Sequence, residues 1–284
     1  MKPIFPNVAI LGLGLIGGSL ALDLKRLGLA KRVMGYNRSP DSRREALRRR
    51  ACDAVFSDPV EAVQDADLVV LAVPVRTIPA LAKKIAPHLK KGAVITDVGS
   101  TKAALNAKVR RVLPKRAVWI GGHPIAGSEH TGMASALSGL FRGRWWILTP
   151  EGRGEAQTAA KLARLLKALG AKVQSMPATE HDRILATSSH LPHLLAFSLV
   201  QLASKKNRRR ALKFSGTSFR DGTRVAASSA EMWVDICLDN RRALLAALAD
   251  YEKLLKALGR DIRGARAGAL RRYFDSAARV RRKL

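Results

Sequence analysis

Acidic residues are scarce in this chain relative to basic ones. The 284 residues include 22 Asp and Glu against 51 Lys and Arg, which gives a formal net charge of +29 at pH 7. A surface of this kind attracts anions, whether nucleic acid or small acidic molecules. The basic clusters at residues 48–50, 205–210 and 279–283 contain no interleaved aromatic side chains for base stacking. We therefore expect non-specific polyanion binding at low salt and no specific nucleic-acid site.

Cysteines, aromatics and long apolar runs are also few. The two cysteines, Cys52 and Cys237, lie far apart without the spacing of a metal site, a pattern typical of a reduced, cytoplasmic protein. No uninterrupted apolar run reaches the roughly 18 residues of a membrane span. Aromatics make up 5% of the chain and hydrophobic residues 47%. The composition therefore predicts two domains with aliphatic cores and no membrane segment.

Glycines are concentrated near the N-terminus in a pattern with a mechanism. Residues 8–11 read as a short buried strand, and Gly12, Gly14 and Gly17 follow at the spacing G-x-G-x-x-G before an apolar helical run. The first glycine permits a tight turn, the second a close approach of pyrophosphate, and the third close helix packing. Free N–H groups at the helix start would face the phosphates. The expected dinucleotide-binding residues here are Gly12, Gly14, Leu15, Ile16 and Gly17.

Two other interpretations of this stretch exist. Lys2 followed by an apolar run is also a feature of secretory signals. Glycines at fixed positions and the amphipathic continuation through Asp23, Lys25 and Arg26 disfavour that interpretation. A glycine-rich turn that binds no ligand is the second alternative.

The end of the second expected strand, residues 32–36, bears on the choice of cofactor. Dinucleotide-binding domains that use NAD carry an acid here for the ribose 2′-hydroxyl. This chain has Asn37, Arg38 and Ser39 instead, with Arg43 close behind. A guanidinium and a hydroxyl suit a 2′-phosphate, so the local chemistry favours NADP over NAD. The alternative is that Arg38 is an ordinary surface arginine.

Further strands are expected at residues 67–73, 93–96, 118–121, 145–149 and 172–176, with a helix at 156–169. Polar groups at the carboxyl ends of such strands line the ligand crevice of open α/β folds. Val73, Pro74 and Ser100 are expected there, beside the cofactor. We predict a doubly wound α/β domain over residues 1–177.

After Pro177 the pattern becomes helical, which predicts an all-α domain over residues 178–284. Helices are expected at 179–204, at 228–258 with Gly259 as the stop, and at 262–280. Long helices of this kind often pair with a second subunit.

Three histidines are candidates for chemistry. His123 follows a strand within Gly-Gly-His-Pro, where an imidazole could accept a proton near neutral pH. A turn histidine bonded to its own backbone is the alternative. His190 and His193 share a helix face around Pro192. They lack a third metal ligand, so no metal is expected, and the alternative is two core histidines at a proline kink.

A charged segment completes the set of candidates. Arg220 and Arg224 lie four residues apart around Asp221, with Trp233 shortly after. Two guanidinium groups in this arrangement could hold a carboxylate through paired hydrogen bonds. A solvated charged turn is the other interpretation.

Five motifs in order, GLGLIGGS, DVGSTK, GGHPIAGSE, SHLPH and RDGTR…MW, resemble the prephenate/arogenate dehydrogenase family of tyrosine biosynthesis. The resemblance extends from residue 8 to about residue 258. It implies a Rossmann-type nucleotide-binding domain followed by an all-α substrate and dimerisation domain, and a homodimer. It also implies NAD(P)-dependent oxidative decarboxylation of a cyclohexadienyl substrate, with prephenate as the main expectation.

The resemblance also implies roles for individual residues. His123 would accept the proton of the ring C4 hydroxyl, and Ser100 would orient that hydroxyl and the histidine. His193 would bind substrate, and Arg224 would hold a substrate carboxylate. Other pocket positions are His190, Glu129, Asp221 and Trp233, with Arg220 standing where some members carry lysine.

Alternatives remain open at the level of substrate and class. A β-hydroxyacid or imine dehydrogenase of the same two-domain plan would commonly rely on a lysine in the helical domain, whereas His123 lies in the nucleotide-binding one. Arogenate differs from prephenate by an amino group in place of a keto group. A basic nucleic-acid-binding protein would explain the charge of +29 but not the five motifs.

Overall fold

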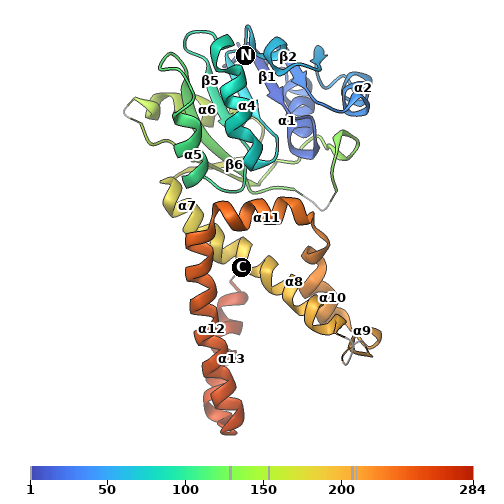
Figure 1. Ribbon diagram of the computed structural model, residues 1–284, viewed down its shortest axis with the longest axis vertical. Helices are drawn as coiled ribbons and strands as arrows, with labels where there is room; N and C mark the ends of the chain where they lie inside the picture. The colour runs from blue at the N-terminus through green and yellow to red at the C-terminus, as the bar shows by residue number, and fades with distance from the viewer. Residues whose placement is uncertain (1, 128–129, 153, 206–207, 209, 284) are drawn as a thin grey trace.

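The structure is a computed structural model that describes residues 2–127, 130–152, 154–205, 208 and 210–283. An α/β domain occupies one end of the molecule and a helical domain the other (Figure 1). Helix α11 (Ala230–Asp239) runs across the junction between the two.

The described residues contain one sheet of eight strands in the order β3-β2-β1-β4-β5-β6-β7-β8. The strands are β1 (Asn7–Leu11), β2 (Arg32–Tyr36), β3 (Ala54–Phe56), β4 (Leu68–Leu71), β5 (Val94–Asp97), β6 (Val118–Pro124), β7 (Trp145–Thr149) and β8 (Lys172–Ser175). Pairing is parallel from β3 to β6 and again between β7 and β8, but β6 and β7 are antiparallel. The order reverses between β1 and β4, where open α/β sheets bind dinucleotides.

Both faces of the sheet are buried. Along β1, Val8 and Ile10 join one core cluster, whereas Ala9 and Leu11 join the other, because successive side chains point to opposite faces. The first cluster includes residues of α1 (Leu15–Arg26), α2 (Pro40–Arg48) and α6 (Glu155–Ala168). The second includes residues of α3 (Pro59–Val63), α4 (Ile78–Ile85) and α5 (Ala103–Arg110), and two short 3₁₀ segments, η1 (Val75–Thr77) and η2 (Ala86–His88), flank α4. A further 3₁₀ turn, η3 (Met133–Ser135), precedes β7. Helices on both faces confirm the doubly wound fold predicted from the sequence.

The helical domain forms two projections (Figure 1). One consists of α8 (Leu191–Ser204), α9 (Arg210–Lys213) and α10 (Thr217–Thr223), and the other of α12 (Arg241–Arg263) and α13 (Ala267–Arg281). The chain enters this domain through α7 (Ala178–Leu185), and η5 (Arg224–Ala227) links α10 to α11. Among helices of the described residues, none is long and apolar enough to span a membrane.

Helix boundaries in this domain differ from the sequence-based ones in two places. The helix expected over residues 179–204 is interrupted by a π-helical segment, η4 (Ala186–His190), directly before Pro192 in the first turn of α8. Proline has no N–H and clashes with the preceding turn, which accounts for the local opening. The prediction that Gly259 ends a helix was wrong, since α12 continues to Arg263 and the break lies at Asn240 instead. A glycine inside a helix costs only about 1 kcal/mol, which packing against α13 can offset.

Candidate active site

The turn between β1 and α1 has the geometry of a pyrophosphate cradle. Gly12 has a φ of +112°, and a Cβ there would overlap the carbonyl oxygen of Ala72. A Cβ at Gly17 would overlap the carbonyl oxygen of Gly12, so both positions require glycine. Around Gly14, in contrast, nothing lies within 4 Å of where a Cβ would be. The first turn of α1 has no acidic residue and no side-chain cap, so its N–H groups are available to an anion, and the site fits a dinucleotide.

The loop after β2 is held in place by its own hydrogen bonds. Asn37 Oδ1 accepts from the Ser39 N–H at 2.9 Å, and the Ser39 hydroxyl caps α2. Arg43 Nη1 donates to the carbonyl oxygens of Asn37 and Arg38, both at 2.9 Å. This leaves the exposed Arg38 as the guanidinium at the loop tip, while Arg43 stabilises the loop.

A buried ion pair lies at the carboxyl end of β5 and is hydrogen-bonded to β6. Asp97 and Lys102 are both fully buried, and their side chains form an ion pair. Asp97 accepts from the N–H groups of Gly99, at 2.8 Å, and Gly122, at 2.9 Å, and Lys102 Nζ donates to the carbonyl oxygen of Gly122 at 2.9 Å. Burial raises the pKa of Asp97 and lowers that of Lys102, and their mutual attraction opposes both shifts. The pair thus fixes the backbone on both sides of the half-buried Ser100.

Val73 and Pro74 follow β4. The side chain of Val73 packs against Gly12, and its Cγ1 is 2.9 Å from the position that a Cβ on that glycine would take. Both residues therefore lie at the same sheet edge as the glycine turn. Ser100 makes no side-chain hydrogen bond among the described residues, so the structure itself gives no contact between Ser100 and His123.

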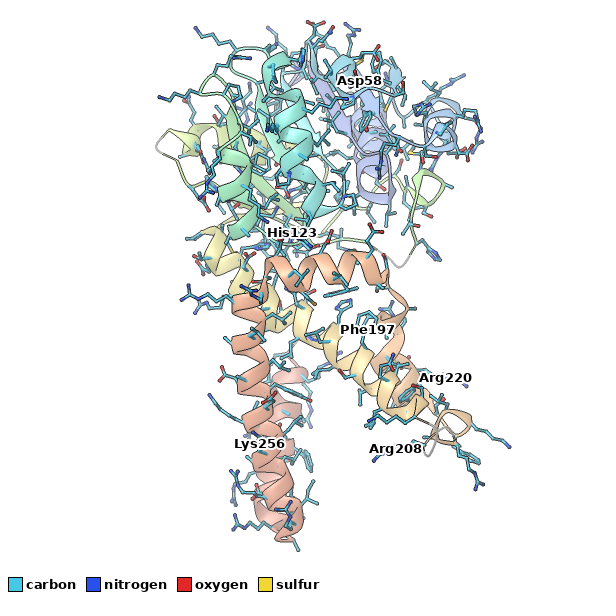
Figure 2. All side chains as sticks on the ribbon, in the orientation of Figure 1. Asp58, His123, Phe197, Arg208, Arg220 and Lys256 are labelled. Atoms are coloured by element: carbon cyan, nitrogen blue, oxygen red, sulfur yellow. The ribbon has the colours of Figure 1, made fainter. Side chains whose placement is uncertain are left out.

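His123 lies near the carboxyl end of β6, at the face of the α/β domain that meets α11 (Figure 2). Two glycines precede it because polar groups crowd the strand on both sides. A Cβ at Gly121 would lie 2.5 Å from Asn106 Oδ1, and one at Gly122 would lie 2.7 Å from the carbonyl oxygen of Asp97. The GGH sequence thus brings the imidazole against a dense buried polar network.

Two residues that sequence reasoning missed form a hydrogen-bonded chain with His123. His123 Nδ1 lies 2.8 Å from His181 Nε2, and His181 Nδ1 lies 2.8 Å from Asp182 Oδ1. His181 is fully buried and Asp182 is 5% exposed. The signal that could have found them is their spacing within α7, because His181 and Asp182 fall on the same helix face as the buried Ala178 and Leu185.

Asp182 also joins the two domains. Its Oδ1 accepts from the Lys102 N–H at 2.8 Å and its Oδ2 from the Ala103 N–H at 2.9 Å, at the start of α5. The helical domain thereby caps a helix of the nucleotide-binding domain. A salt bridge between Lys108 of α5 and Asp239 of α11, 3.3 Å apart, also links the two domains.

Burial lowers the pKa of His123 well below its usual range, and electrostatic interactions with His181, Lys102 and His190 act in the same direction. His123 is therefore neutral at physiological pH. A neutral imidazole can accept a proton, as a general base must.

A second group of aromatic and imidazole side chains lies on the helical side. His193 stacks on Trp233 with ring centroids 4.0 Å apart, and His190 meets the same indole edge-on at 6.0 Å. Asn240 Nδ2 donates to His190 Nδ1 at 3.0 Å, so the proton of His190 is on Nε2. His190 Nε2 and Trp233 Nε1 are both buried donors without a partner among the described residues. Because buried donors are nearly always hydrogen-bonded in folded proteins, these two N–H groups indicate a place where a ligand could supply an acceptor.

The pH dependence of stability should reflect His190. Burial lowers its pKa to about 4, against the opposing attraction of the Asp182 carboxylate. In the unfolded chain a histidine titrates near 6.5, so the stabilisation is complete above that pH and is lost as pH falls toward 4. We expect the free energy of unfolding to fall by about 3 kcal/mol over this interval from His190 alone. Denaturation at a series of pH values should show a shallower slope for His190→Gln and an unchanged one for His88→Gln, an exposed histidine. Equal slopes in all three proteins would contradict this assignment.

Of the charged segment expected to hold a carboxylate, Arg224 lies near the His193 and Trp233 side chains. Burial first, and then the Arg224 guanidinium, lower the pKa of His193, which puts Arg224 within electrostatic reach of that ring. Arg220 and Asp221 are exposed on α10, and Figure 2 shows Arg220 along the α8–α10 projection, away from His123. Glu129 lies outside the described residues.

No cluster of three or more His, Cys, Asp or Glu side chains in the described part of the chain could hold a metal ion. The two described cysteines are both unpaired, with Cys52 buried.

Comparisons with known proteins agree on one family. The family model "Prephenate dehydrogenase, nucleotide-binding domain" matches residues 20–175, and "Prephenate dehydrogenase, dimerization domain" matches residues 177–276. The cyclohexadienyl dehydrogenase of Zymomonas mobilis is 37% identical over 98% of this chain and 96% of its own length.

Solved structures are similar over the same extent. Prephenate dehydrogenase from Aquifex aeolicus, in complex with hydroxyphenyl propionate and NAD+, has a TM-score of 0.91 at 34% identity, covering 98% of this chain and 97% of that one. Synechocystis arogenate dehydrogenase has a TM-score of 0.85 at 31% identity, covering 98% and 99%. With a nucleotide cradle, a buried imidazole at the same sheet edge and relatives matched over nearly their whole length, the chain belongs to the prephenate/arogenate dehydrogenase family of NAD(P)-dependent oxidoreductases.

Proposed function

We propose that the preferred substrate is prephenate, that it is converted to 4-hydroxyphenylpyruvate, and that His123 is the general base. The observation that carries the proposal is the position of His123: it is buried, neutral, and near the carboxyl end of β6, at the same edge of the sheet as the glycine turn. Oxidative decarboxylation of a cyclohexadienyl acid forms an aromatic ring, so the protein needs mainly to align the substrate and to accept one proton.

In this mechanism His123 accepts a hydrogen bond, and then the proton, from the C4 hydroxyl of the substrate. A nicotinamide bound at the cradle would accept the hydrogen of C4 together with the electron pair of the C4–H bond, as hydride. As C4 gains carbonyl character, the electron pair of the bond to the departing CO2 enters the ring, and His123 returns the proton to the oxygen of the aromatic product. We propose that Ser100 orients the hydroxyl, since Asp97 and Lys102 hold the backbone on either side of it.

The substrate carboxylates need donors, and the helical side of the site offers them. The unpaired Nε2–H of His190 and Nε1–H of Trp233 support a role for both in holding an acceptor oxygen. His193 and Arg224 are proposed as further substrate contacts, because the two lie within electrostatic reach of each other beside the indole. Glu129, Asp221 and Arg220 are proposed for the pocket entrance on the family resemblance.

The test is an assay of purified protein with prephenate or arogenate, each combined with NAD or NADP. The readout is the absorbance of the reduced cofactor. We expect the highest kcat/KM with prephenate and NADP. If the protein turns over arogenate and not prephenate, the substrate assignment is wrong, and the amino analogue takes the place of prephenate in the same mechanism. Absence of turnover in all four mixtures would overturn the proposal.

NADP is proposed as the favoured cofactor because no acid stands at the end of β2 and Arg38 is exposed there. Asn37→Asp should reverse the preference, since a carboxylate would bond the ribose 2′-hydroxyl and repel a 2′-phosphate. Its Oδ1 would still accept from the Ser39 N–H, so the loop should keep its shape. We expect kcat/KM with NADP to fall on the order of tenfold or more, and kcat/KM with NAD to rise, in steady-state assays.

The matched control for this change is Gln64→Glu, another amide-to-acid replacement. Gln64 is exposed and lines a groove with Asn7 and Arg32, at the opposite ends of the strands. The Gln64→Glu protein should have the same ratio of kcat/KM with NADP to kcat/KM with NAD as the wild type. A wild-type protein that uses NAD much better than NADP would show that the Arg38 loop does not select for phosphate.

We further propose a homodimer formed through the helical domain, in a reduced cytoplasmic setting. The supporting observation is a set of exposed large apolar side chains on α12 and α13: Leu245, Leu254, Leu255, Ile262, Tyr273, Phe274 and Val280. A second copy of the chain would cover them. Light scattering that gave the mass of a monomer at micromolar concentration would contradict the dimer.

A further inference from the structure

A hydrogen-bonded chain leads from His123 through His181 to Asp182, on a different domain. Each ring nitrogen in it is 2.8 Å from its neighbour, and His181, in the middle, is completely buried. The roles of donor and acceptor along this chain follow from its far end.

Asp182 fixes the direction of the donors. Its two oxygens accept from the backbone N–H groups of Lys102 and Ala103, which can only donate. A carboxylate held in this way accepts from His181 Nδ1 as well, so the proton of His181 is on Nδ1. The unprotonated Nε2 of His181 must then accept, and its hydrogen-bond partner among the described residues is the Nδ1–H of His123.

With Nδ1 of His123 committed as a donor, its Nε2 carries the lone pair and is the atom that can take a proton. Without His181, the imidazole could place its proton on either nitrogen and turn within its pocket. A base oriented by a third group is a recurring arrangement in proton-transfer sites.

We propose that His181 and Asp182 are positioning residues for catalysis, which hold His123 in the tautomer with a free Nε2 and stabilise the charge that it gains. When His123 Nε2 takes the hydroxyl proton, the ring becomes a cation whose Nδ1–H already points at His181. The Asp182 carboxylate, one ring further, is the compensating negative charge. When the proton returns to the oxygen of the product, the chain is restored with no net change. This inference rests on the proposed role of His123 as base.

Three variants separate orientation from simple packing. His181→Leu fills the space but can neither donate nor accept. His181→Gln keeps one donor and one acceptor, so it should partly restore the bridge. Asp182→Asn removes the negative charge but can keep an acceptor for His181, because its amide oxygen can take the place of Oδ1, which accepts from His181 Nδ1 and the Lys102 N–H, and its NH2 group then faces the Ala103 N–H.

We expect His181→Leu and Asp182→Asn to lower kcat on the order of 10²-fold or more while KM changes little. His181→Gln should recover at least tenfold of that loss. His88→Gln, at an exposed histidine, is the control and should match the wild type. Because Asp182 also caps α5, its variant should melt earlier, and the comparison of Leu with Gln at position 181 is the decisive one. Wild-type kcat in His181→Leu, or equal losses in both variants at position 181, would overturn the proposal.

A second measurement does not depend on activity. In ¹⁵N-histidine-labelled protein, ring nitrogen shifts should show Nδ1 protonated and Nε2 unprotonated in both His123 and His181, with signals assigned from the His123→Asn and His181→Gln proteins. A proton on Nε2 of His123, or a doubly protonated His181, in the wild type at pH 7 would overturn the relay. If instead His123→Asn keeps full activity while these shifts are as expected, the base assignment fails and the tautomer assignment stands.

Discussion

Replacing His123 by Asn is expected to lower kcat by about 10²–10⁴-fold with prephenate, the range that a positioned general base contributes. Asparagine keeps a donor toward His181, so the hydrogen-bonded chain and the fold should persist. It has no nitrogen lone pair at the position of Nε2, so the hydroxyl proton has no acceptor. KM should change little, because the donors assigned to the carboxylates, His190 and Trp233, are untouched.

The pH profile gives an independent check on the same residue. The neutral form of His123 is the active one, and its pKa lies well below 6.5, mainly because of burial. In the wild type, kcat/KM should therefore be constant through neutral pH and fall only as pH drops below the pKa of His123. His88→Asn, the exposed control, should behave like the wild type. A His123→Asn protein with wild-type kcat would exclude His123 as the base.

Replacing Lys102 by Met is expected to have the largest effect on stability. It leaves the fully buried Asp97 carboxylate with only the N–H groups of Gly99 and Gly122 as partners. Removing one member of a buried ion pair costs about 3–5 kcal/mol, because the remaining charge stays desolvated. For a chain of this size the melting temperature should fall by roughly 10 °C in a thermal scan.

A matched surface change separates this effect from loss of a lysine in general. Lys108 pairs with Asp239 at 3.3 Å but is about half exposed, so Lys108→Met should cost about 1 kcal/mol or less. The double variant Asp97→Asn/Lys102→Met should recover part of the stability, since a neutral amide is easier to bury. If Lys102→Met melts with the wild type, the buried pair does not hold the β5 and β6 ends.

Local sequence was sufficient for the nucleotide-binding half. The G-x-G-x-x-G stretch predicts its own turn, because the overlaps at Gly12 and Gly17 involve backbone and neighbours that any strand–turn–helix unit brings together. His123 was found for the same reason, as a polar residue at the end of an apolar strand. These features depend on residues close in sequence and on the period of the hydrophobic pattern.

Helix ends in the second half were harder to predict. The break at Asn240 is fixed by its side chain, which donates to the carbonyl oxygen of Asp182 and to His190, 58 and 50 residues away. No local signal reveals such partners. Gly259 does not end a helix because tertiary packing outweighs the low intrinsic helix propensity of glycine.

By itself, then, the sequence determined the fold class, the cofactor cradle, the family resemblance and the base candidate. Only the tertiary structure decided which nitrogen of His123 is free, because that depends on His181 and Asp182. Their contact with β6 and α5 forms when two domains close on each other. Hydrogen-bond direction is a property of the assembled network, in which the backbone N–H groups of Lys102 and Ala103 orient a carboxylate, the carboxylate orients one imidazole, and that imidazole orients the next.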